Sequence, residues 1–139
     1  MLDADQANIT FKNVKDMKDK AKKWISSDLS KPILSLRPED ESLIHAAIAM
    51  RNFIAHESQK SRRLMNEALR KLGDHSDHSD LKISHKDVKT VGAYLKAFTN
   101  NGPRFLSLAV KLGNLAEKLD PNVKSVKARQ AKERRMKEF

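Results

Sequence analysis

The sequence predicts an all-α protein, a small bundle of about five helices followed by a basic C-terminal tail. Charged residues make up 33% of the 139 residues and aromatic residues only 5%, a balance typical of a solvated helical protein rather than a sheet-rich one. The chain also has only 4 Gly and 4 Pro, and few helix-breaking residues favour long helices. This length suits a single domain with a modest core.

The first helix is expected from Ala7 to Ile25, where apolar residues recur at helical spacing and lysines cover the other side. Residues 26–38 contain Ser-Ser, Lys-Pro and Arg-Pro pairs, which predict a connecting loop. The apolar residues of this loop that we expect to pack against the bundle are Ile33, Leu34 and Leu36.

Two longer helices are expected next. The second helix is predicted from Glu39 to His56, because acidic residues at its start suit the positive end of the helix dipole. The third is predicted from Gln59 to Leu72, with Gly73 as its stop.

Residues 74–80 read Asp-His-Ser-Asp-His-Ser-Asp, a short tandem repeat. Asp and His can ligate metals, but a zinc site needs ligands held in tetrahedral geometry, which a polar loop of this length does not provide. We therefore expect a solvated loop between helices and no metal site.

Two further helices are expected before the tail. Ser84 resembles an N-cap with Asp87 three positions on, which predicts a fourth helix running to about Asn100. The segment Asn-Asn-Gly then breaks the pattern, and Pro103 suits the first turn of a fifth helix that ends at Leu119. The side chains that the fourth helix is expected to bury are Val88, Val91, Leu95 and Phe98.

Positive charge is concentrated at the C-terminus. We predict a helical domain over residues 1–120 and a basic tail over residues 121–139. The tail holds seven Lys or Arg residues and two Glu residues, so its net positive charge is half of the +10 of the whole chain. Such a tail attracts polyanions, nucleic acid above all, in a salt-sensitive manner. A solvated extension is the alternative.

Some classes of protein are excluded or disfavoured by composition. The sequence has no cysteine, so disulfides and thiolate metal sites are excluded. No run approaches the ~20 apolar residues of a membrane span, and the N-terminus lacks the apolar region of a signal peptide. We expect a cytoplasmic protein that does not associate with membranes.

The end of the second predicted helix carries a polar cluster, Arg51, Asn52 and His56. On an ideal helix Asn52 and His56 fall with His45 in a narrow polar stripe opposite a broad apolar face, and Arg51 flanks that stripe. A buried polar stripe is unfavourable, so it must face water, a satisfied partner or a polar cleft. For His45 alone, a structural role is the expected one.

These residue types suit phosphodiester chemistry. Histidine exchanges a proton near neutral pH, arginine offers a fork of donors to phosphate oxygens, and asparagine holds neighbouring groups by hydrogen bonds. RNA supplies its own nucleophile, the 2′-hydroxyl. A base and a phosphate clamp would therefore be a sufficient minimal set, without a metal.

The motif Arg51-Asn52-x-x-x-His56 resembles the signature of the HEPN superfamily, an arginine followed by a polar residue and, a few positions on, a histidine. The resemblance implies a HEPN-like helical fold and a homodimer in which the two motifs face each other across a shared cleft. It also implies a metal-independent endoribonuclease of toxin–antitoxin or antiphage systems, with no cofactor. Arg51 and His56 would carry catalysis to a 2′,3′-cyclic phosphate, and Asn52 would orient them.

The partners that this resemblance implies are RNA, a second copy and an antitoxin or regulatory protein. Some members carry a tyrosine two residues after the histidine, which a partner nucleotidyltransferase modifies. Here Glu57 and Ser58 follow His56 and the only tyrosine is Tyr94, so we do not expect neutralisation by that route.

A basic cluster, Lys60, Arg62 and Arg63, begins four residues after His56. We predict that it binds RNA phosphates close to the motif. An ordinary solvated helix face is the alternative for this cluster.

Other interpretations of the motif and of the charge stay open. Arg51 and Asn52 could cap or salt-bridge a helix end, and His56 could simply interact with the helix dipole. The chain could also be a non-catalytic HEPN-like dimer that binds RNA or a partner protein. A third possibility is a helical adaptor whose tail docks on nucleic acid or an acidic protein.

Overall fold

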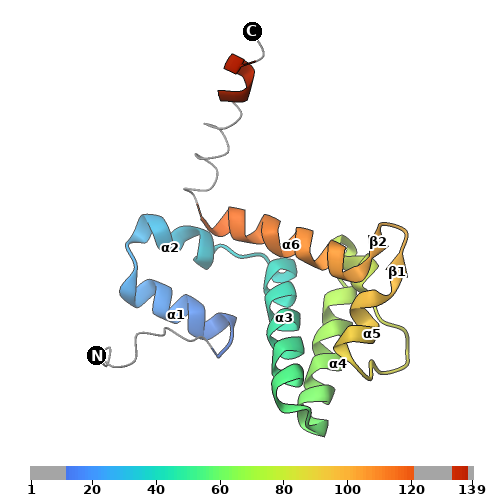
Figure 1. The fold of residues 1–139 in the computed structure, drawn as a ribbon. Coiled ribbons are helices and arrows are strands. Elements are labelled where there is room, and N and C mark those ends of the chain that lie inside the picture. The colour runs from blue at the N-terminus through green and yellow to red at the C-terminus, as the bar shows by residue number, and fades with distance from the viewer. Residues whose placement is uncertain (1–11, 121–132, 138–139) are drawn as a thin grey trace.

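The computed structural model describes residues 12–120 and 133–137, and it is a small, mostly helical bundle, as the sequence predicts (Figure 1). Within those residues the only strands are two short ones, which pair antiparallel as Phe98 with Pro103 and Thr99 with Gly102. Residues 133–137 are helical. The elements are α1 (Val14–Trp24), α2 (Ser27–Leu34), α3 (Pro38–His56), α4 (Gln59–Gly73), the 3₁₀ helix η1 (Ser76–Leu81), α5 (Val91–Lys96), β1 (Phe98–Thr99), β2 (Gly102–Pro103) and α6 (Arg104–Leu119).

The centre of the molecule is the antiparallel hairpin of α3 and α4, whose limits agree with the predicted ones to within one residue (Figure 1). Pro38 opens α3 at a position where its missing N–H has no helical partner. Glu57 ends it with a left-handed backbone, φ 46°, and Ser58 then caps α4. Local residues thus fix both ends of the turn.

The core lies mainly between this hairpin and the elements that follow it, and Val14 and Leu36 from before the hairpin also belong to it. α6 crosses one end of the hairpin (Figure 1) and buries Leu108 and Leu115. Lys118 near the end of α6 bonds Asp40 at the start of α3, with 2.7 Å between Nζ and Oδ2. The largest fully buried side chains are Leu43, Met65, Leu69, Leu72, Leu81 and Asn66.

The predicted loop over residues 26–38 is wrong in its first part, because residues 27–34 form α2. Pro32 lies inside α2 and removes only one backbone donor from this short helix. The apolar residues pack as expected: Leu36 is buried, and Ile33 and Leu34 are half-buried. Tertiary packing therefore stabilises a helix that the local sequence disfavours.

The predicted fourth helix, from Ser84 to about Asn100, is also wrong over most of its length. Residues 82–90 are not helical, and α5 begins only at Val91, where the Thr90 hydroxyl accepts from the Ala93 N–H at 3.1 Å. The Ser84 hydroxyl instead accepts from the Lys86 N–H at 3.4 Å, within a turn.

A buried amide explains the difference. Asn66 on α4 is 1% exposed; its Oδ1 accepts from the Val88 N–H at 2.7 Å and its Nδ2 donates to the Val88 carbonyl at 3.2 Å. These bonds satisfy the Val88 backbone outside a helix. Downstream, Phe98 is 82% exposed although the sequence predicted it buried. Of the other side chains predicted to be buried, Val91 is buried, and Val88 and Leu95 are half-buried.

Residues 76–80 of the Asp-His-Ser repeat belong to the 3₁₀ helix η1, so this part is not the loop that the sequence predicted, although several of its side chains are exposed. His78 is 6% exposed and its Nε2 lies 3.3 Å from the Glu39 carbonyl oxygen, so this histidine ties η1 to α3. In residues 12–120 and 133–137, no three His, Asp or Glu side chains are placed to hold a metal ion.

The structure tests the elements predicted at the two ends of the chain only in part. α1 begins at Val14, whereas the predicted helix began at Ala7, and residues 1–11 lie outside the described residues. Of the basic tail, residues 121–132 and 138–139 also lie outside them. α6 matches the predicted fifth helix except that Pro103 is its N-cap. No helix among the described residues has the length and apolar character needed to cross a membrane.

A candidate site in the groove between α3 and α4

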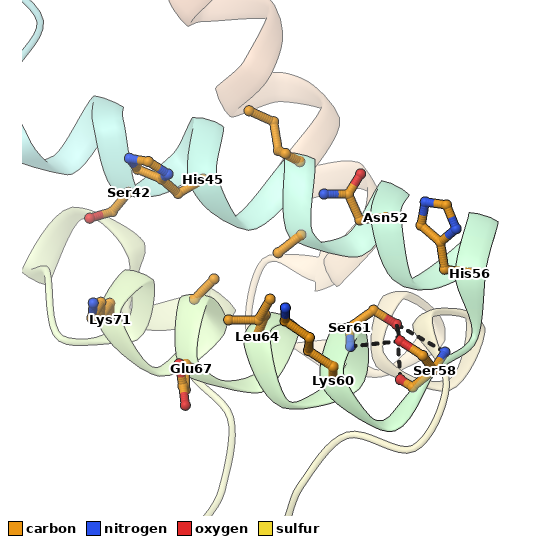
Figure 2. A pocket seen from close by; sticks show the side chains of 13 residues that line it. Ser42, His45, Asn52, His56, Ser58, Lys60, Ser61, Leu64, Glu67 and Lys71 are labelled. Atoms are coloured by element: carbon orange, nitrogen blue, oxygen red, sulfur yellow. Dashed lines mark hydrogen bonds between the residues drawn. The ribbon is translucent and has the colours of Figure 1, made fainter. Parts of the chain in front are cut away.

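An open groove of about 540 Å³ runs between α3 and α4 (Figure 2). Because the helices are antiparallel, each end of the groove combines the end of one helix with the start of the other. The end near the 57–58 turn is lined by Asn52, His56, Ser58, Lys60 and Ser61. We call this the motif end. Ser42, His45 and Lys71 line the opposite end, which we call the far end.

Two of the three predicted catalytic residues meet in this groove. Asn52 and His56 are four positions apart, about one helical turn, and both line its motif end (Figure 2). Both are exposed, so a ligand in the groove could reach them. The imidazole can exchange a proton and the amide can donate a hydrogen bond there.

Arg51 is not part of the groove. One residue along a helix is a rotation of about 100°, so Arg51 lies on the face of α3 beside Asn52. It is exposed and shares that face with apolar neighbours, among them Ile54, which is 62% exposed, and Ala55. The groove therefore brings His56 and Asn52 together and leaves the Arg51 guanidinium outside.

Of the predicted RNA-binding cluster, only Lys60 lines the groove. Arg62 lies instead at a small surface hollow with residues 85–89. Arg63 is exposed and pairs loosely with Glu67, with 3.9 Å between Nε and Oε1. Adjacent positions on a helix point in different directions, so a cluster in sequence is not a cluster in space.

The start of α4 is held by two serines, and this fixes where Lys60 emerges. The Ser58 hydroxyl accepts from the Ser61 N–H at 3.0 Å, and the Ser61 hydroxyl accepts from the Ser58 N–H at 3.0 Å (Figure 2). This reciprocal pair is a capping box, which stabilises the first helical turn. Both serines also line the motif end of the groove.

The far end contains residues that the sequence analysis gave no role in binding. His45 is exposed to the groove, and the Ser42 Oγ lies 3.0 Å from Nε2 of His75, which comes from the Asp-His-Ser repeat. Lys71 of α4 also lines the far end. The sequence contains a sign of this far end. His45 lies in one stripe with Asn52 and His56, and Lys71 follows Lys60 by eleven positions, a spacing of three helical turns that places both lysines on one face.

Comparison with known proteins adds no family to these observations: no family model, no curated protein and no solved structure matches this chain. The resemblance of the motif to that of the HEPN superfamily therefore stays a prediction from three residues of the sequence.

Proposed function

We propose that this protein is a metal-independent endoribonuclease of the HEPN type, active as a homodimer, that leaves a 2′,3′-cyclic phosphate. The observation that supports it most is the gathering of His56, Asn52 and Lys60 at one end of a single open groove. These side chains supply a proton-exchanging group and two hydrogen-bond donors, which is what cleavage by the RNA's own 2′-hydroxyl needs.

In this proposal the imidazole of His56 takes the proton of the 2′-hydroxyl as that oxygen attacks the neighbouring phosphorus. The bond from phosphorus to the 5′-oxygen breaks, the 5′-oxygen takes a proton from water, and His56 returns its own proton to the solvent. Lys60 and Asn52 donate to the phosphate oxygens, whose negative charge grows in the transition state. No group in this step has to be a metal.

Arg51 has a role in the proposal only if a second copy is present. Its face of α3 is apolar and exposed, with Ile54 and Ala55 beside the guanidinium. Exposed apolar side chains on one face of a helix suit contact with another protein surface. Two-fold pairing of α3 with α3 would cover this face and carry each Arg51 toward the partner's groove.

The same proposal gives the protein an RNA substrate, a cytoplasmic setting and a restraining partner such as an antitoxin. The charge of +10 suits a polyanionic substrate.

The test is cleavage of labelled single-stranded RNA by the purified chain in EDTA. We expect His56→Ala to lower the cleavage rate by about a hundredfold or more, since general acid–base groups contribute that much. His85→Ala is the matched control, because His85 is an exposed histidine that does not line the groove between α3 and α4. Cleavage that survives His56→Ala at the wild-type rate, with the helical content unchanged, would refute the assignment.

A second candidate is a non-catalytic dimer that binds RNA, and the position of Arg51 outside the groove favours it. The Arg51→Ala variant separates the two. If Arg51 completes the catalytic site, the variant dimerises and binds RNA but cleaves slowly. If the protein only binds, the wild type forms a complex with RNA in EDTA and produces no cyclic phosphate.

A further inference from the structure

We propose that the far end of the groove is a second phosphate-binding site, so that the groove holds a single strand of RNA along its length. This rests on the proposed function, because it assumes that RNA occupies the motif end. The site would consist of His45, Lys71 and Ser42, with Ser42 held by His75. None of these four residues belongs to the motif.

The two ends of the groove present the same pair of side chains. His56 of α3 and Lys60 of α4 line the motif end, and His45 of α3 and Lys71 of α4 line the far end (Figure 2). Each histidine and each lysine is eleven positions from its counterpart. Eleven residues make three helical turns and span about 16 Å. Because the helices run in opposite directions, the histidine at each end of the groove on α3 lies opposite a lysine on α4.

Between the two ends the lining is mostly apolar, with Ile48, Ala49, Leu64 and Ala68 beside one carboxylate, Glu67. Single-stranded RNA exposes base faces between its phosphates, and unpaired bases pack on apolar surfaces. Charged ends around an apolar middle therefore match a single strand. In a duplex the base faces are stacked inside the helix, and a peptide made of acidic residues alone has no planar apolar groups to place there.

The hydrogen bond between Ser42 and His75 prepares the far end to donate to an anion. When Nε2 of His75 carries the hydrogen, it donates to the Ser42 oxygen at 3.0 Å. The serine O–H is then free to donate to a phosphate oxygen. His75 lies directly before η1, so the Asp-His-Ser repeat supplies the residue that orients this serine.

One carboxylate, Glu67, stands among the described residues that line the groove. Arg63 does not line the groove, and its Nε lies 3.9 Å from Oε1 of Glu67. The two groove lysines outnumber it, so the lining remains positive before either histidine is protonated.

The experiment measures binding of fluorescein-labelled oligoribonucleotides by fluorescence anisotropy in EDTA. Every ribose is 2′-O-methylated, which removes the nucleophile and prevents cleavage. The oligonucleotides are a dinucleotide, which has one internucleotide phosphate, and an octanucleotide, which can reach both ends. We expect the wild type to bind the octanucleotide more tightly, and Lys71→Ala and Ser42→Ala to lose about threefold in that affinity. Their affinity for the dinucleotide should fall less, because the motif end can still bind its single phosphate.

The matched control is Lys96→Ala, which removes the same charge from α5 at an exposed position away from the groove. Lys71→Ala should also reduce the salt dependence of octanucleotide binding by about 0.7 in the log–log slope, the value for one phosphate contact on a single strand. If Lys71→Ala and Lys96→Ala give the same affinities and slopes, the far site does not exist.

Two other outcomes would also overturn the inference. Poly-glutamate that displaces the octanucleotide as well as unlabelled RNA does would make the groove a general anion site. If the wild type bound the dinucleotide as tightly as the octanucleotide, only the motif end of the groove would bind RNA. Failure of the proposed function appears separately: unmethylated RNA is then bound with this length dependence but its cleavage does not respond to His56→Ala.

Discussion

The α3–α4 hairpin and the segment of residues 82–103 are held in the fold by different forces. The hairpin is joined by apolar side chains that exclude water, among them Leu43, Met65 and Leu69, each 2% exposed or less. The segment also buries apolar side chains, among them Ile83 and Val91, but in addition it depends on single side chains that bond to backbone groups. The Asn66 amide bonds Val88, the Tyr94 hydroxyl donates to the Leu81 carbonyl, and Arg104 donates to the Lys82 carbonyl.

The difference shows where a sequence pattern determines structure. Apolar burial depends on many residues that repeat at the helical period, so a pattern of apolar residues records it. A hydrogen bond from a side chain to a distant backbone group depends on one residue. The sequence around the bonded backbone group contains no pattern that predicts this bond. The hairpin should therefore fail by loss of packing, and the segment by loss of single hydrogen bonds.

The largest expected effect is in the hairpin. Leu69→Ala should lower the free energy of unfolding by about 4 kcal/mol, because Leu69 is completely buried and its removal leaves a cavity as well as lost contacts. Urea denaturation followed by circular dichroism measures this. Leu64→Ala is the control, since Leu64 on the same helix is 45% exposed. Equal losses in the two variants would contradict the assigned core.

Sequence patterns located the hairpin to within one residue because its ends are encoded locally, by Pro38 and by Ser58. They also placed Asn52 and His56 on one face, which is the face of the groove. The same patterns assigned a helix to residues 84–100, because apolar spacing there resembles a helix and the competing bonds come from α4, about twenty residues away.

The rest of the candidate site depended on facts that no local pattern contains. Proximity to His56 in sequence suggested that Lys60, Arg62 and Arg63 act together, but rotation about the helix axis directs the two arginines elsewhere. The far end needs Ser42 and His75, which are 33 positions apart and meet only because η1 returns to α3.

A smaller loss of stability, from a change at Asn66, should distinguish the hairpin from residues 82–103. Asn66→Ala leaves the Val88 N–H and carbonyl without their partners, which should cost about 2 kcal/mol. The loss should be local: hydrogen exchange at Val88 should accelerate more than at Leu69. Asn114→Ala, at an exposed position on α6, is the control. Uniform acceleration across both regions would mean that Asn66 supports the whole core rather than the segment.

The smallest effect belongs to Tyr94, which is 3% exposed and donates to the Leu81 carbonyl at 2.7 Å. Tyr94→Phe should cost about 1 kcal/mol at neutral pH, since it leaves that carbonyl without a partner. Burial raises the pKa of the Tyr94 hydroxyl to about 12; the nearby Arg104 opposes this and Asp80 adds to it. In the unfolded chain the same hydroxyl has a pKa near 10.

The sign of the pH dependence follows from these two values. Below pH 10 the hydroxyl is neutral in both states, so its full contribution to stability is present. Between pH 10 and about 12 the unfolded chain loses the proton while the folded protein keeps it, so stability falls as pH rises. The difference in stability between the wild type and Tyr94→Phe should therefore shrink over this range. Because Tyr94 is the only tyrosine, its ultraviolet absorbance reports the titration without interference. A folded protein whose tyrosine titrates near pH 10 would show that residues 82–103 do not pack against the hairpin as described, and the contrast between the two regions would be lost with it.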